Sequence, residues 1–162
     1  MKPQEMAICL WFDSQAEEAV NFYTSVFKDS KIGIISKYGK EGFEHHQKPE
    51  GSIMSIDFKL NGMNFTALNG GPMFKFNESV SIMVYCDTQE EIDYYWDKLS
   101  EKGETSYCGW LKDQFGVSWQ IIPSILIQHL ANQDKERSVR MQKAVFQMTK
   151  FEIDKLIEAY NG

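Results

Sequence analysis

The same order of strands and helices occurs twice along this chain. In the first copy, the apolar residues 7–12 predict a central strand, and an amphipathic stripe over residues 16–27 predicts a helix. In the second copy, residues 79–86 predict a strand, and a stripe ending before Gly103 predicts another helix. Sequence patterns typical of capping boxes precede both helices, at Ser14–Glu17 and Thr88–Glu91. We therefore expect one β-α-β-β-β unit used twice.

A hairpin signal closes the first copy. Residues 31–38 predict a strand, residues 39–51 a polar loop, and residues 52–60 a strand that alternates apolar and polar side chains. Asn61-Gly62 is a strong signal for a tight hairpin turn. We therefore expect residues 63–68 to return antiparallel, with the opposing pairs Leu60–Met63, Phe58–Phe65 and Ile56–Ala67.

The second copy ends in a short strand that contains one polar amide. Gly116 can take the positive φ of a tight turn, and residues 117–122 then form a β-rich run that Pro123 ends. Gln120 lies in the middle of this run, between Trp119 and Ile121. A buried amide needs hydrogen-bond partners, and this makes Gln120 the clearest functional candidate in the sequence.

These patterns predict an α+β fold with two β-α-β-β-β modules, at about residues 6–71 and 79–123. One such module would leave a sheet edge open and a sheet face uncovered, so we expect the two modules to form a curved mixed sheet with a concave cavity. This predicts a domain over residues 1–123 and a C-terminal helical extension over residues 124–162. The amphipathic helices of the extension must pack either on the domain or on a second subunit.

Composition excludes several classes of partner. The chain has 17 basic and 23 acidic side chains, a net charge of −6, and no basic tract, which argues against nucleic acid and anionic membranes. The apolar residues 6–12 are too few for a signal peptide or a membrane-spanning helix. Three cysteines without metal-binding spacing are typical of a reducing compartment. We therefore expect a cytoplasmic protein.

Three motifs agree in order and spacing with one known family. They are Trp11-Phe12-x-x-x-Ala16-Glu17-Glu18-Ala19-x-x-Phe22-Tyr23, Leu68-Asn69-Gly70-Gly71-Pro72 and Gly109-Trp110-Leu111-Lys112-Asp113-x-Phe115-Gly116-x-x-Trp119-Gln120. Together with the doubled layout, these motifs resemble the PhnB-like group of the vicinal oxygen chelate superfamily, which includes glyoxalase I, extradiol dioxygenases and the bleomycin and fosfomycin resistance proteins. This group is often labelled demethylubiquinone methyltransferase.

The resemblance implies a divalent metal held by the first, fourth, fifth and eighth strands, usually through His, Glu, His and Glu. The corresponding positions here are Ile8, Ala67, Ser81 and Gln120. Isoleucine and alanine cannot bind a metal, and a neutral hydroxyl and amide are weak ligands without carboxylate or imidazole support. We therefore expect no metal site and no cofactor.

If those four positions face inward, alternation along the strands predicts an apolar and aromatic cavity with few polar groups, which is typical of a small-molecule site. A hydrogen bond between Gln120 and Ser81 would fit either a satisfied core or a pair that receives a ligand's polar group. Asp113 fits either the cavity mouth or a turn that binds its own backbone. The predicted ligand-binding residues are Phe12, Phe65, Asn69, Ser81, Met83, Tyr85, Trp110, Asp113 and Gln120.

The sequence therefore supports a metal-free protein that binds a small apolar or aromatic molecule, with no set of residues that specifies catalysis. One alternative is an enzyme of the superfamily, of the lyase, dioxygenase or transferase type, with an altered metal site. Another is a methyltransferase, although the segment Asp13-Ser14-Gln15 after the first strand lacks the glycine-rich turn of nucleotide-binding sheets. By analogy with the superfamily, we expect a homodimer.

Overall fold

The computed structural model describes residues 5–130 and 134–162, and the chain divides into two units at the Phe76–Asn77 bond. Residues 1–4, at the polar start, and residues 131–133, within the predicted extension, lie outside the described residues. No helix in the described part of the chain has the length and apolar character needed to cross a membrane.

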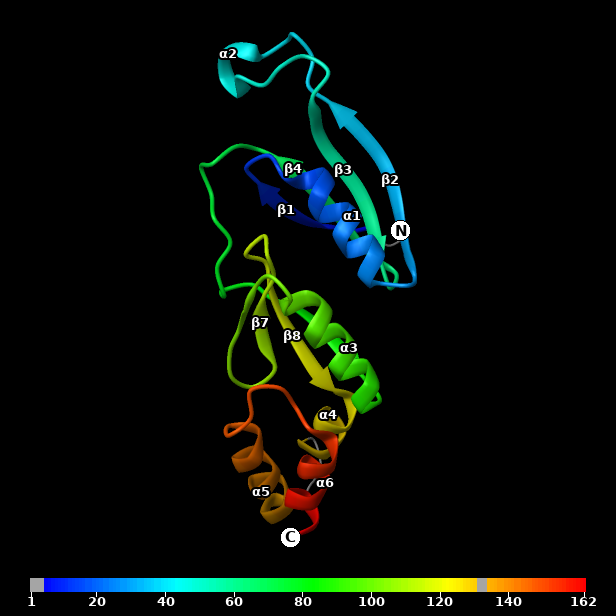
Figure 1. The fold of residues 1–162 in the computed structure, drawn as a ribbon, viewed down its shortest axis with the longest axis vertical. Coiled ribbons are helices and arrows are strands. Elements are labelled where there is room, and N and C mark those ends of the chain that lie inside the picture. Colours follow the sequence, from blue (N-terminus) through cyan, green and yellow to red (C-terminus); the bar gives the residue numbers. More distant parts are fainter. Residues whose placement is uncertain (1–4, 131–133) are drawn as a thin grey trace. The chain divides into compact units, whose positions relative to one another are not determined.

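The first unit is a four-stranded mixed sheet with one long helix on it (Figure 1). The strand order is β1-β4-β3-β2, with β1 parallel to β4 and the other neighbours antiparallel. Its elements are β1 (Ile8–Phe12), α1 (Ala16–Val26), β2 (Ser30–Lys37), α2 (Phe43–His46), β3 (Ile53–Leu60) and β4 (Met63–Asn69).

The predicted hairpin between β3 and β4 is confirmed residue by residue. Asn61 and Gly62 both have positive φ, 46° and 81°, as a two-residue hairpin turn of the primed type requires. The opposing pairs are those expected: Leu60–Met63, Phe58–Phe65 and Ile56–Ala67.

The predicted capping box of α1 is wrong, because a distant residue supplies a hydrogen bond at this end of the helix. The N-cap is Gln15, whose side chain makes no capping hydrogen bond. Instead Asn69, at the end of β4, accepts a hydrogen bond from the Ala16 amide at 2.9 Å and donates one to the Ile53 carbonyl at 3.0 Å. Asn69 thus joins the start of α1 to β3 and β4.

The second unit repeats this topology with the strand order β5-β8-β7-β6. Strands β5 and β8 are parallel, and the other neighbours are antiparallel, so the predicted α+β fold of two β-α-β-β-β modules is confirmed. The elements of the module are β5 (Ile82–Cys86), α3 (Gln89–Ser100), β6 (Glu104–Thr105), β7 (Trp110–Lys112) and β8 (Ser118–Pro123). The capping box at Thr88 and Glu91 forms as predicted.

The C-terminal helices pack on their own module. They are α4 (Ser124–Leu130), α5 (Lys135–Val145) and α6 (Ile153–Asn161). Between α5 and α6, the carbonyls of Met148 and Thr149 accept hydrogen bonds from the amides of Cys108 and Gly109, both at 2.8 Å, and Phe151 is only 1% exposed. The tail is therefore part of the second unit.

The start of α6 depends on the side chain of Gln89, in the first turn of α3. This amide accepts a hydrogen bond from the Ile153 amide at 2.9 Å and donates one to the Phe151 carbonyl at 3.1 Å. Thr149 and Glu152 have the sequence spacing of a capping box, but the box does not form, because the N-cap is Glu152 and it makes no side-chain capping bond. A side chain from α3 supplies the hydrogen bond instead.

Candidate functional site

In the second unit, one face of the sheet is covered by a helix. Helix α3 buries Ile92, Trp96 and Leu99, and it packs on β5, β7 and β8. The residues of the sheet that alternate toward this face are buried: Ile82, Val84, Cys86, Leu111, Trp119 and Ile121. Burial also raises the pKa of the Cys86 thiol to about 12, with a smaller effect of the Glu91 and Asp87 carboxylates, so this cysteine is not a nucleophile at neutral pH.

The opposite face of the sheet, which we call the bare face, carries no helix of the β-α-β-β-β module. It is defined by Ser81, Met83, Tyr85, Trp110, Lys112, Ser118 and Gln120. Met83 lies opposite Gln120 in the register, as does Trp110 on the other side. Met83 is 42% exposed and Tyr85 is 54% exposed on β5, an edge strand of this sheet, so the bare face presents large side chains to solvent.

The predicted hydrogen bond between Gln120 and Ser81 forms on the bare face. The Gln120 amide donates to the Ser81 hydroxyl at 2.7 Å, and both residues are half-buried. The amide oxygen of Gln120 makes no hydrogen bond that the structure records, so it is available to a donor from outside the sheet. The Tyr85 hydroxyl lies 3.6 Å from the Met83 sulfur.

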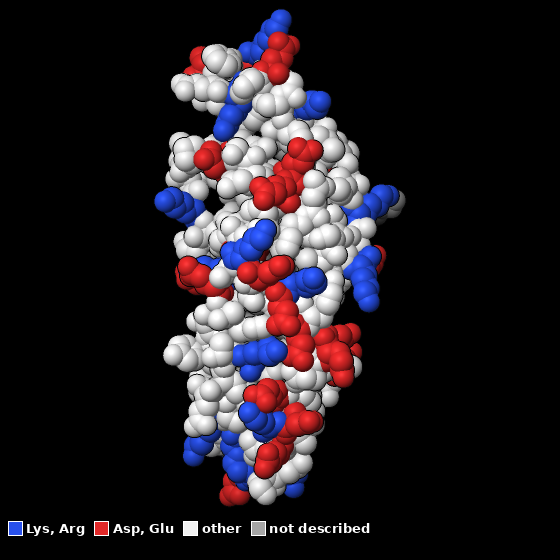
Figure 2. All heavy atoms as spheres, viewed as in Figure 1, with Lys and Arg blue, Asp and Glu red and all other residues white. Residues whose placement is uncertain are grey.

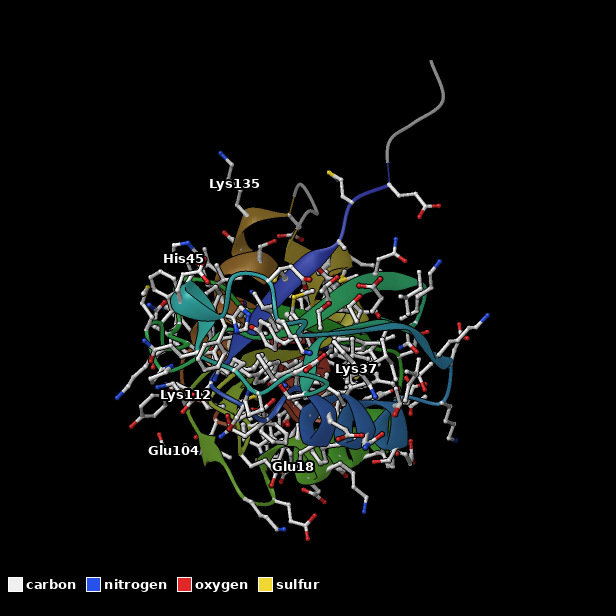
Figure 3. The ribbon with its side chains drawn as sticks, turned by 90° about the horizontal axis from the view of Figure 1, so that it is seen from above. Glu18, Lys37, His45, Glu104, Lys112 and Lys135 are labelled. Carbon is white, nitrogen blue, oxygen red and sulfur yellow. The ribbon has the colours of Figure 1, made fainter. Side chains whose placement is uncertain are left out.

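Next to this pair lies a pocket of about 560 Å³, which we call the Lys112 pocket. It is lined by Glu78, Glu104, Thr105, Ser106, Tyr107, Trp110, Leu111, Lys112 and Ser118. Lys112 forms an ion pair with Glu78 and lies opposite Glu104 in the register of β6 and β7. Figure 3 labels Lys112 and Glu104 on the same side of the view. The hydrogen bond and charge of Lys112 lower the pKa of the Glu78 carboxyl, and the hydrogen bond that Lys112 donates to Glu78 raises the pKa of Lys112.

Asp113 takes the structural role that the sequence left open. It is 3% exposed and accepts hydrogen bonds from the backbone amides of Phe115 and Val117, at 2.9 and 3.1 Å, and from the Trp119 indole at 2.8 Å. These bonds hold the turn that ends at Gly116, where φ is 85°. Asp113 therefore supports the start of β8.

The predicted placement of Phe12, Phe65 and Asn69 on an uncovered face is wrong. All three are buried, and Phe65 stacks on Phe58, which stacks on Tyr23 of α1. In the first unit, the residues taken as inward therefore face the helix. The side chains on the uncovered face are their neighbours in sequence, such as Cys9, Trp11 and Thr66, because a shift of one residue along a strand exchanges the two faces.

The uncovered face of the first unit is polar. The Thr66 hydroxyl donates to the Asp57 carboxylate at 2.7 Å, and both residues line a cavity of about 380 Å³ together with Lys31, Lys59 and Asn64. On the molecular face seen in Figure 2, basic and acidic side chains are interspersed. Apolar residues, among them Met6, Ala7 and Phe65, also line the cavity of the first unit.

The residues of each unit do not fit the divalent metal that the superfamily's enzymes hold. Within residues 5–130 and 134–162, no three His, Cys, Asp or Glu side chains lie together as metal ligands would. The donors nearest the inherited positions in the second unit are the Ser81 hydroxyl and the Gln120 amide, which are already bonded to each other. Neutral oxygen donors of this kind are weak ligands without carboxylate support.

Sequence reasoning missed the Lys112 pocket and Ser118. The signal was present, because alternation from Gln120 places Ser118 on the same face, and alternation from Trp110 places Lys112 there. What the sequence could not give was the position of Glu78, which comes from the segment before β5 and reaches Lys112 across the pocket.

Comparison with known proteins agrees with this topology. A family model described as 3-demethylubiquinone-9 3-methyltransferase matches residues 4–122. The chain belongs to this family. Its members include the PhnB-like proteins of the vicinal oxygen chelate fold, so the resemblance seen in the sequence is confirmed. The matched residues end before α4, so the C-terminal helices lie outside the family model.

Solved structures extend the comparison. A PhnB protein from Bacillus cereus, which carries the same methyltransferase label in its name, is 36% identical, with a TM-score of 0.65 over 75% of this chain and 100% of that one. A protein from Pseudomonas aeruginosa is 18% identical, with a TM-score of 0.60 over 75% of this chain and 98% of its own. The fosfomycin resistance protein FosX from Mesorhizobium loti is 13% identical, with a TM-score of 0.56 over 82% of this chain and 100% of its own. The last two share the fold alone. Among curated protein sequences, the comparison found no match.

Proposed function

We propose that this PhnB-like protein binds a small apolar or aromatic molecule on the bare face of the second unit, without a metal. The observation that carries the proposal is the Gln120–Ser81 hydrogen bond, which lies beside the exposed side chains of Met83 and Tyr85. A ring resting on these side chains would place its polar substituent within reach of the Gln120 amide oxygen. Apolar contact with one or two oriented polar groups is the usual composition of a small-molecule site.

The magnitudes fit a weakly bound ligand. Covering the exposed parts of Met83 and Tyr85 contributes roughly 2–3 kcal/mol, at about 25 cal/mol per Å² of apolar surface. A hydrogen bond to Gln120 contributes about 1 kcal/mol more. The ligand's own buried surface must offset the cost of association, so we expect dissociation constants in the micromolar to millimolar range.

We expect Gln120→Leu to weaken binding of polar aromatic compounds roughly tenfold, because the substitution removes the amide and keeps an apolar side chain of similar size. The measurement is ligand-observed NMR with a panel of phenols, aromatic amides and aromatic amines, on protein that has been treated with a chelator to remove metal ions. Gln128→Leu, on the exposed side of α4, is the matched control and should leave the affinities unchanged. A panel in which no compound loses affinity in Gln120→Leu would contradict the proposal.

The second candidate function is the methyl transfer that the family name describes. The name of the matching family model is what favours it. The segment after β1, Asp13-Ser14-Gln15, contains no glycine, so a cofactor would need a site unlike that of nucleotide-binding sheets. Calorimetry with S-adenosylmethionine at millimolar concentration tests this candidate, and an absence of binding heat would remove it.

We also propose that the protein is a cytoplasmic homodimer. Support for pairing comes from β2, an edge strand on which Ile34 is 71% exposed, because exposed apolar edges favour association with another chain. Sedimentation equilibrium at micromolar concentration should give about twice the 18.8 kDa mass of the chain. A single species of chain mass would remove the dimer.

A further inference from the structure

Ser118, which lines the Lys112 pocket, has a buried hydroxyl without a hydrogen-bond partner among the described residues. The residue is 2% exposed, and in the part of the chain that the structure describes its Oγ is the buried side-chain polar atom with no hydrogen-bond partner. Buried hydroxyls in folded proteins are nearly always bonded, because they have given up their bonds to water. An unpartnered hydroxyl beside a pocket therefore points to a group that enters the pocket.

The charges of the pocket favour a positive group. Lys112 is the single cation among the lining residues, and its ammonium is already paired with the Glu78 carboxylate. Glu104 lies across from Lys112 on the neighbouring strand and makes no ion pair within the described residues. The pocket thus contains two carboxylates and one ammonium, and Glu104 is the charge left without a direct partner.

The aromatic side chains of the pocket agree with this preference. Trp110 is half-buried on β7, and Tyr107, in the loop before β7, is 71% exposed. The faces of indole and phenol rings carry negative potential and attract cations, and such contacts strengthen when water is excluded. A carboxylate, two aromatic rings and a free hydroxyl oxygen are together suited to an alkylammonium group.

We propose that the Lys112 pocket binds the protonated amine of the molecule whose apolar part lies on the bare face. This rests on the proposed function, and it defines the ligand class as small aromatic or apolar amines. Trp110 belongs to both regions, since it lines the pocket and lies opposite Gln120 in the register. Ser118 accepts a hydrogen bond from the ammonium, Glu104 supplies the opposite charge, and Trp110 covers the amine from one side.

An anionic ligand is the competing interpretation, because Lys112 and several hydroxyls also line the pocket. An anion would have to displace Glu78 from Lys112 and would then lie near both carboxylates. The two carboxylates would repel a bound anion. A bound ammonium would instead be attracted by Glu104, while the ion pair between Lys112 and Glu78 stays intact. The two interpretations make opposite predictions for the loss of Lys112.

Three probes that share a phenethyl group separate charge from shape: phenethylamine, 2-phenylethanol and 3-phenylpropionate. On the intact protein at neutral pH and low salt, we expect phenethylamine to bind roughly tenfold more tightly than the alcohol, with the acid weakest. Glu104→Gln should remove this preference and leave binding of the alcohol unchanged. Glu101→Gln, which makes the same change of charge at an exposed position, is the control and should change neither.

Two further variants test the assignment of roles. Lys112→Met should tighten phenethylamine binding, because it removes the one positive charge, and a loss of 3-phenylpropionate binding in place of that gain would overturn the proposal. Ser118→Ala should raise the melting temperature of the free protein, because it removes an unsatisfied hydroxyl. It should also weaken phenethylamine binding severalfold. A merely structural serine would lower stability when truncated.

The outcomes distinguish this inference from the proposed function. If amine and alcohol bind equally, and both lose affinity in Gln120→Leu, the amine subsite is refuted and the proposed function stands. If Gln120→Leu changes the affinity of none of the three probes, both the amine subsite and the proposed function are refuted. The tightest binding by 3-phenylpropionate would refute the amine subsite and identify Lys112 as an anion site.

Discussion

Asp113→Ala should lower the free energy of unfolding by about 3–5 kcal/mol, the largest effect we expect from a single polar substitution here. The carboxylate accepts three hydrogen bonds, from the amides of Phe115 and Val117 and from the Trp119 indole, and it is almost fully buried. Its loss leaves those donors unpaired inside the protein, and each unpaired buried donor costs roughly 1–3 kcal/mol, though not additively.

Urea denaturation followed by tryptophan fluorescence measures this effect, since Trp119 is itself one of the partners. Asp97→Ala is the control, because Asp97 is exposed on α3, and its stability should stay within about 0.5 kcal/mol of the parent. Asp113→Asn should lose less than Asp113→Ala, because an amide oxygen can still accept the backbone bonds. Equal stability of Asp113→Ala and the parent would show that the carboxylate does not hold this turn.

Gly109→Ala should destabilise the second unit by about 2–5 kcal/mol and release the tail from it. Gly109 has a φ of 77°, and a Cβ there would lie 2.6 Å from the Ile121 carbonyl oxygen and 2.7 Å from the ring of Phe151. The backbone amide of Gly109 also donates a hydrogen bond to the Thr149 carbonyl. An added methyl group would therefore push against both the sheet and the docked tail.

Gly51→Ala separates the two causes of that loss. Gly51 has a nearly equal φ of 81°, and nothing lies within 4 Å of the position a Cβ would take. This control should lose only the strain of the left-handed backbone, about 1–2 kcal/mol. Limited proteolysis should cleave between α5 and α6 in Gly109→Ala alone, and similar losses without cleavage in both variants would contradict a packing role for Gly109.

The fold was predictable because its signals are local. Alternation along residues 52–60 and the Asn61-Gly62 turn determine the β3–β4 register, and the stripe ending at Phe27 identifies the face of α1 that is buried. The capping box of α3 formed because its partners, Thr88 and Glu91, are three residues apart. For interactions of this range the sequence pattern is sufficient.

The errors concern partners that are distant in sequence. Asn69, at the end of β4 and 53 residues along the chain, supplies a hydrogen bond in place of the expected box of α1, and Gln89 does the same for α6. Neither hydrogen bond can be predicted from the residues next to the start of the helix. The faces of β1 and β4 were assigned from supposed metal positions rather than from burial, and a one-residue error exchanged the whole set. The same assumption placed Ser81 and Gln120 on the uncovered face of the second module, where the structure also has them.

The hydrogen bonds between the tail and the loop before β7 affect the order in which the protein matures. A chain is made from its N-terminus, so the first unit has all of its strands once β4 has been synthesised. The second unit cannot complete the bonds of Cys108 and Gly109 until residue 149 exists, about forty residues later. Contacts between such distant residues form slowly. The two modules, alike in topology, should therefore differ in the time that their newly synthesised strands remain without all of their native contacts. A nascent chain stalled before Met148 would hold a complete first unit and a second unit that lacks the bonds of Cys108 and Gly109.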